Sequence, residues 1–161
     1  MARTMKRNPW LVSGDVYPVP VRATDSKKRL AGQFGLYAAA GTVEPMATDG
    51  TKVNVQFLQD QTTSTDSTDV WVHVIQASDE FEGFVSTDDE DATATVANVG
   101  NDYGITNTGT DYYNTVNTNE TTNVAVTVTD YAARYNPLTD NTSDSPGKVR
   151  FRFKASVLDA S

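Results

Sequence analysis

The stretch Thr122–Tyr131, which reads TNVAVTVTDY, decides the fold class. Val124, Val126 and Val128 recur at every second position, with small or polar residues between them. A period of two puts these valines on one face of an extended strand, and β-branched side chains favour strands over helices. We therefore predict a half-buried β-strand over this stretch.

The same alternation recurs along the chain. Three further long segments show it, at residues 51–58, 69–76 and 148–158. The segment 69–76 is apolar on nearly both faces, which predicts a strand covered on two sides. Shorter strands are expected at residues 16–21, 34–38, 81–85, 103–106 and 112–116. Polar stretches rich in turn-forming Thr, Asp and Asn separate the strands at residues 59–68, 106–111 and 136–147.

One helix is predicted over residues 88–99. Thr87 and Glu90 have the spacing of a capping box, and Gly100 is placed to end the helix. The acidic run Asp88–Asp91 is then explained by the positive N-terminal end of this helix. Adventitious cation binding is the alternative explanation of the run. The fold class is therefore all-β: a small antiparallel sandwich or barrel with an extended N-terminal arm and at most one short helix.

Composition excludes several functional classes. The chain of 161 residues has no cysteine and a single histidine, His73, so thiolate chemistry and sites with two imidazoles are excluded. His73 lies within an apolar strand, which indicates a hydrogen-bonded structural histidine. We expect no catalytic residue, no metal site and no cofactor, so the protein is not an enzyme. No apolar run approaches the roughly 20 residues that span a bilayer, so no membrane partner is expected.

Charge is strongly segregated along the chain. The net charge is −8, yet residues 53–133 contain fourteen acidic side chains and no Lys or Arg. Such an acidic centre repels nucleic acid, so we expect no nucleic-acid partner. Residues 1–30 are basic and contain Pro9, Pro18 and Pro20, which predicts an extended arm before a β domain at 31–161. The basic start is interrupted by Asn8-Pro9-Trp10 and is no secretory signal, so we expect synthesis in a cytoplasm.

Two groups of residues are candidates for binding a partner. The arm contributes Arg3, Lys6, Arg7, Trp10, Lys27, Lys28 and Arg29. On the last strand, four cations alternate with the apolar face and form a stripe about 20 Å long: Lys148, Arg150, Arg152 and Lys154. This stripe either docks onto an acidic protein surface, protects a solvated edge strand from aggregation, or pairs with the chain's own acids.

The C-terminal part of the chain resembles a known family. Three segments carry the resemblance: GNDYGIT at residues 100–106, TTNVAVTVTD at 121–130 and SPGKVRFRF at 145–153. Their Gly-x-x-Tyr hairpin, Thr-Asn strand ending in Asp, and final Gly-x-Val-x-Phe strand are similar to those of small head decoration (cement) proteins of tailed bacteriophages.

This resemblance implies a structural virion protein without enzymatic activity or cofactor. It would be made in the host cytoplasm, bind the major capsid protein on the outside of the head, commonly as a homotrimer, and stabilise the shell by clamping neighbouring subunits. Two alternatives stay open. One is an extracellular β-sandwich module for adhesion or carbohydrate binding, for which Trp71, Tyr112 and Tyr113 are the aromatic candidates, although Trp71 is expected to be buried. The other is a minor tail or spike protein of a virion.

Overall fold

The computed structural model describes residues 8–23, 29–38, 42–61, 68–88, 90–108 and 113–158, and their fold is all-β as predicted. The strands are β1 Trp10–Ser13, β2 Pro18–Ala23, β3 Phe34–Ala38, β4 Thr42–Pro45, β5 Val55–Phe57, β6 Thr68–Val74, β7 Glu80–Thr87, β8 Glu90–Asp91, β9 Asp102–Thr108, β10 Tyr113–Asn117, β11 Val126–Tyr131 and β12 Lys148–Phe153. The helices of the described residues are the one-turn α1 Ala132–Tyr135 and α2 Ala155–Leu158 and the 3-10 helix η1 Val96–Asn98.

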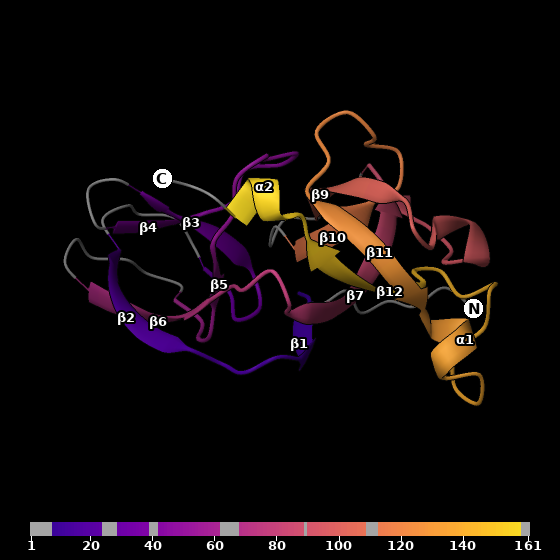
Figure 1. The fold of residues 1–161 in the computed structure, drawn as a ribbon, viewed down its shortest axis with the longest axis horizontal. Helices are drawn as coiled ribbons and strands as arrows, with labels where there is room; N and C mark the ends of the chain where they lie inside the picture. Colours follow the sequence, from indigo (N-terminus) through magenta and orange to yellow (C-terminus); the bar gives the residue numbers. More distant parts are fainter. Residues whose placement is uncertain are drawn as a thin grey trace.

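The strands form two closed circuits that lie side by side (Figure 1). The first is a barrel in the order β2-β4-β3-β5-β6, drawn in indigo to magenta. The second runs β7-β10-β9-β11-β12 and returns to β7 through the β12–β7 pairing, while β1 and β8 attach to β7. Closing a sheet on itself removes exposed strand edges. Most pairings are antiparallel as predicted, but β2–β4 and β7–β10 are parallel.

Period-two alternation fills each circuit with side chains. Val21, Val43, Val55, Phe57, Val70 and Val72 form the interior of the first barrel. A larger core lies within the second circuit and at its junction with the first, and Phe34 of β3 belongs to it. The Phe34 ring lies edge-on to Phe81, Phe151 and Phe153, with ring centroids 5.3, 6.2 and 4.7 Å away. One aromatic ring of the first barrel is therefore locked into the core of the second.

The described part of the predicted N-terminal arm is folded. β1 pairs with β7 in the second circuit, and β2 pairs with β6 along its whole length in the first. Residues 10–23 thus connect the two circuits. The prolines of this segment do not prevent strand formation. Pro18 and Pro20 lie in β2, which pairs with β6 on one side and with β4 only at Arg22–Thr42 on the other, so no second partner needs their missing N–H groups. The expected boundary at residue 30 therefore does not separate an arm from a β domain over the described residues.

The helix predicted over residues 88–99 is wrong. Glu90 and Asp91 instead pair with Thr87 and Ser86 as strand β8, and only the turn Val96–Asn98 is helical. The backbone amide of Thr95 donates to the side chain of Asn98, so the local cap lies eight residues after Thr87. Gly100 does follow the helical turn with a positive φ of 82°, as expected of a terminating glycine. The acidic run is therefore not a helix N-terminus.

The last strand also differs from its prediction. The alternation over residues 148–158 is strand only to Phe153, after which Ala155–Leu158 form helix α2 and bury Val157. β12 is not an edge strand, because it pairs with β11 on one side and β7 on the other. Its polar face therefore looks onto acidic side chains of neighbouring strands.

Candidate functional site

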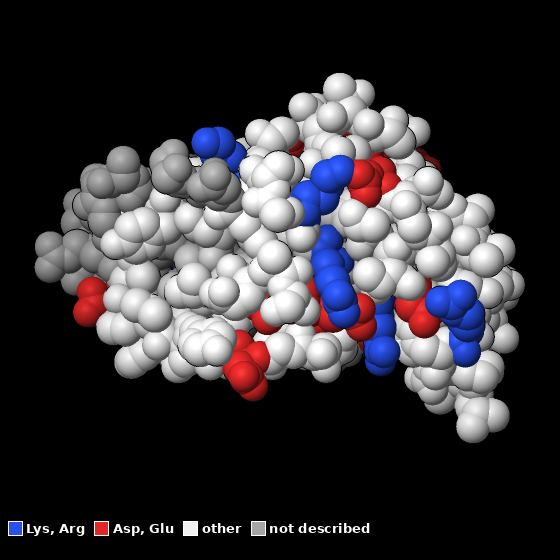
Figure 2. Space-filling model, in the orientation of Figure 1, with Lys and Arg blue, Asp and Glu red and all other residues white. Residues whose placement is uncertain are grey.

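The predicted cation stripe lies along β12 with its neighbours' carboxylates beside it. Val149, Phe151 and Phe153 point into the core, which leaves Lys148, Arg150 and Arg152 on the outer face. Blue and red atoms consequently lie next to one another along this strand (Figure 2). The acidic partners come from β7, β9 and the loop before β12, and not from β12 itself.

Each cation of the stripe has an acid of the same chain within ion-pair distance. Lys148 Nζ lies 3.0 Å from Asp140 Oδ1 and 3.9 Å from Glu82 Oε1. Arg152 Nε lies 3.5 Å from Glu80 Oε2, although half of the Arg152 side chain remains exposed. With Arg150 opposite Glu82 and Lys154 opposite Asp102, the four cations face four carboxylates. The stripe therefore has no net charge to offer a partner.

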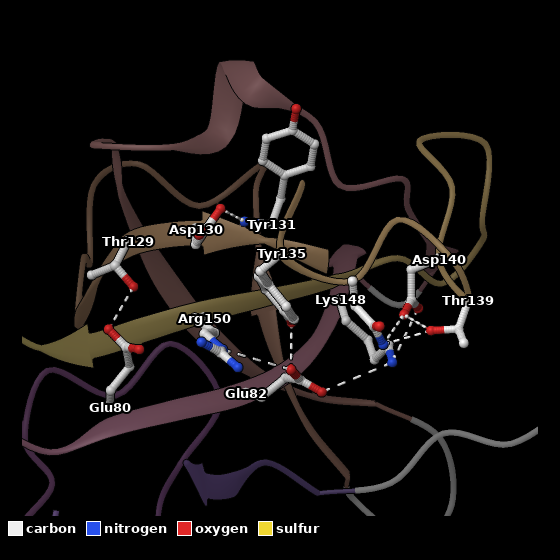
Figure 3. Close-up of polar contacts among 11 residues, drawn as sticks. Glu80, Glu82, Thr129, Asp130, Tyr131, Tyr135, Thr139, Asp140, Lys148 and Arg150 are labelled. Atoms are coloured by element: carbon white, nitrogen blue, oxygen red, sulfur yellow. Dashed lines mark hydrogen bonds and ion pairs between the residues drawn. The ribbon is translucent and has the colours of Figure 1, made fainter. Parts of the chain in front are cut away.

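Glu82 is the centre of this network (Figure 3). Its carboxylate accepts a hydrogen bond from the Tyr135 hydroxyl and lies 3.9 Å from Arg150 Nε. The Arg150 guanidinium also stacks on the Tyr135 ring, 4.1 Å from its centroid. Burial raises the pKa of Tyr135 well above its ordinary value, and the hydrogen bond to Glu82 raises it further. We call Glu82, Tyr135, Asp140, Lys148 and Arg150 the Glu82 cluster.

Lys154 closes the stripe at its other end. Its amine donates to Asp102 Oδ2, while the Thr127 hydroxyl donates to Asp102 Oδ1 at 2.6 Å. These hydrogen bonds, that of Lys154 foremost, hold the pKa of Asp102 below its ordinary value. These contacts tie the residue that follows β12 to β9 and β11, so their geometry serves the sheet.

The arm candidates fall into three groups. Arg3, Lys6, Arg7, Lys27 and Lys28 lie outside the described residues. Trp10 is half-buried in β1, where its ring packs edge-on to Phe84 at 6.5 Å.

Arg29 does not lie on the surface. It has no exposed area, and its guanidinium donates to Gln61 Oε1 at 3.1 Å and to the Val43 carbonyl at 3.3 Å. Burial lowers the pKa of Arg29, with Glu44 acting in the opposite direction. The sequence could not reveal this position, because a basic residue among Lys27 and Lys28 normally points to solvent. Arg29 therefore packs inside the first barrel and cannot touch a partner there.

An apolar surface that the sequence did not predict is exposed to solvent. Trp71 is 46% exposed, although its segment predicted a strand covered on two sides. Pro20 pairs directly with Trp71 across β2 and β6, and the Leu58 amide donates to the Trp71 carbonyl from the other side. Leu58 is 38% exposed, and Val16, which borders the same small hollow as Leu58, is 51% exposed. We call Val16, Pro20, Leu58 and Trp71 the apolar band.

Three exposed acidic residues lie close in sequence to members of the apolar band. Asp15 directly precedes Val16, Asp60 follows Leu58 by two residues, and Asp69 precedes Trp71 by two residues. Contiguous exposed apolar surface with a polar rim is typical of protein interaction sites. The band thus fits a partner surface that is apolar at its centre and neutral or basic at its edge.

His73 is the structural histidine that its position predicted. The side chain is completely buried, and Nδ1 accepts a hydrogen bond from the Tyr17 amide at 3.0 Å. Because Nδ1 is an acceptor, Nε2 carries the proton and donates to Asp79 Oδ2 at 2.7 Å. Across the described residues, no three His, Asp or Glu side chains gather as a metal site would require. Within the same residues, no helix has the length and apolar character needed to cross a bilayer.

Comparison with known proteins adds no relative. No protein-family model matches the chain, and neither a curated protein nor a solved structure matches it. The resemblance to phage head decoration proteins therefore depends on the three C-terminal sequence segments alone.

Proposed function

We propose that this chain is a structural virion protein that binds the outer surface of a phage head and clamps neighbouring subunits of the major capsid protein. The observation that carries the proposal is the position of the three segments that resemble decoration proteins. Residues 100–106, 121–130 and 145–153 contribute to β9, β11 and β12, which are hydrogen-bonded neighbours in one circuit. Segments scattered over the last two-fifths of the chain thus form one contiguous unit.

The apolar band is the contact surface that we assign to the shell. Its Trp71 is the type of residue that most often dominates an interface, and burying it would supply most of the binding energy. The cation stripe is assigned to the stability of the protein itself, because its charges are paired internally. Homotrimeric assembly on the head, as in the decoration proteins, is part of the proposal.

Thermal unfolding of empty shells tests this function. A protein that binds only the intact shell raises the temperature at which shells disrupt, by mass action. We expect a rise with the wild-type protein, and at least a roughly 30-fold loss of shell affinity in Trp71→Ala, the factor that about 2 kcal/mol represents. Arg152→Glu is the matched surface control, since half of its side chain is exposed and it belongs to the stripe. Unchanged shell stability with saturating wild-type protein would overturn the proposal.

One observation favours a second function. An exposed Trp71 meets the main requirement of the carbohydrate-binding alternative, an aromatic platform on one strand face. Retention on immobilised polysaccharides that Trp71→Ala abolishes, together with no binding to shells, would favour that alternative. A few copies per particle, in contrast, would favour a minor tail or spike protein.

A further inference from the structure

Leu138 is an apolar side chain displayed on a rigid loop. It is 96% exposed, and its loop joins α1 to β12. Figure 1 shows α1 at the end of the second circuit. Pro137, also exposed, fixes the backbone directly before it. A leucine presented in this way gains nothing for the stability of its own chain.

Hydrogen bonds close the loop on both sides of Leu138. The Asn136 side chain donates to Thr139 Oγ1 at 2.5 Å and to Asp140 Oδ2 at 3.1 Å. The Asp140 amide returns to the Asn136 carbonyl at 3.1 Å, and the Asp140 carboxylate is held by Lys148. Because the loop is already ordered, little conformational entropy is lost when Leu138 inserts into a partner.

The same chain carries a pocket of matching chemistry. A pocket of about 660 Å³ lies where β3, β4 and the segment 46–52 meet β9 and β10. Its walls are largely apolar, with Leu36, Pro45, Met46 and Ala47, and its polar lining includes Asn107 and Asn114. This volume is within the usual range for binding pockets and exceeds what one leucine needs, so Pro137 fits beside it.

Charge at the two surfaces is complementary. Lys52 borders the pocket and is exposed, whereas the loop after Leu138 carries Asp144. Arg134 of α1 does not contribute to this match, because its guanidinium is paired with Asp130 at 2.7 Å. A loop seated in the pocket can thus set opposite charges against each other at the rim, which fixes orientation more than it adds affinity.

We propose that Leu138 of one copy inserts into the pocket between β3, β4 and β9–β10 of a second copy of this chain. The pocket lies at the junction of the two circuits, whereas α1 lies at the far end of the second circuit from β3 and β4 (Figure 1), so insertion within one chain does not occur. Because knob and pocket are different surfaces, the contact is head-to-tail, and it closes a ring or extends a filament. The inference is independent of shell binding, because it concerns the isolated protein.

Disulfide trapping tests the contact cleanly, since the chain has no cysteine. Pro137→Cys keeps Leu138 intact, and Ala47→Cys puts a thiol on the exposed pocket wall. The two variants are mixed and oxidised, and the initial rate of disulfide-linked heterodimer formation is measured. The matched control pairs Ala47→Cys with the double variant Pro137→Cys/Leu138→Ser.

Burying one leucine changes an association constant by roughly 10- to 100-fold, and we expect a rate loss in that range for the Leu138→Ser control. Circular dichroism of the Leu138→Ser variant should match wild type, because the side chain touches little of its own chain. Equal rates with and without Leu138 would overturn the proposal. Preferential formation of Pro137→Cys homodimers would overturn it as well, since the loop would then meet another loop.

Discussion

Replacing Glu82 by Gln probes the Glu82 cluster most sharply. The substitution keeps the shape of the side chain and leaves an oxygen to accept from the Tyr135 hydroxyl, but it removes the charge. A hydrogen bond to a charged group is worth about 1 kcal/mol more than a neutral one. Two ion pairs at 3.9 Å, to Lys148 and Arg150, are lost as well, each worth about 0.2–1 kcal/mol. The expected loss in free energy of unfolding is therefore about 1.5–3 kcal/mol.

Glu80→Gln is the matched control on the same strand. Glu80 has one ion pair, to the half-exposed Arg152, and a hydrogen bond from Thr129 that glutamine can also accept. Its expected cost, from one charged hydrogen bond and one ion pair instead of two, is about 1–2 kcal/mol, at the lower end because Arg152 is half exposed. Urea unfolding followed by tryptophan fluorescence measures both, with the midpoint shifted and the slope unchanged. Equal losses for the two variants would refute the view that Glu82 is the centre of the network.

Three further predictions concern pH and packing. The pKa of Tyr135 in the folded protein lies above its ordinary 10.0. The stability that the protonated hydroxyl provides is therefore present at neutral pH and is lost as the pH rises above 10. The free energy of unfolding, measured from about pH 8 to 11, should fall less steeply in Tyr135→Phe than in wild type. Asp102→Asn should cost about 0.2–1 kcal/mol of unfolding free energy at pH 7, because its partner Lys154 is partly exposed. The pKa of Asp102 is lowered in the folded protein, so this cost should vanish as the pH falls below that pKa. A cost that stays constant down to about pH 2 would contradict this. Phe34→Ala should cost about 3–5 kcal/mol in urea unfolding, because the ring is fully buried at the junction of the two circuits, and a loss below about 1 kcal/mol would mean that the circuits are not joined there.

The alternation of apolar and polar residues predicted the strands because it depends only on residues that are close together in the sequence. Val126 and Val128 alternate with polar residues in β11 and are both buried, because such a pattern buries one face of a strand whatever its neighbours are. The strands β6 and β9 were accordingly predicted within two residues of their observed bounds, whereas the predictions for β11 and β12 were four and five residues too long at one end. The number of circuits was not predictable, because closure depends on pairings such as β12 with β7 that join residues far apart in sequence.

The misreadings share a cause of the same kind. Trp71 lies in an apolar run, and only the position of β6 in its barrel decides that this side chain faces solvent. The helix expected to begin at Thr87 is replaced by a hairpin in which Ser86 and Thr87 pair with β8. The Asp88 amide in this hairpin donates to the side chain of Asn117 in β10, a tertiary contact that overrides helix propensity. The alternation around Arg150 predicted the cation stripe. Its acidic partners were not predictable, because they come from strands whose register relative to β12 the sequence does not reveal.

Protein composition of purified phage particles tests the central claim, that this chain coats a phage head, most directly. Quantitative mass spectrometry gives the ratio of this chain to the major capsid protein, and brief surface proteolysis of intact particles reports on which side of the shell the chain lies. We predict a copy number of the same order as that of the capsid protein, with the chain cleaved or released while the capsid protein stays intact. Absence from the particles, or only a few copies in each, would contradict the account.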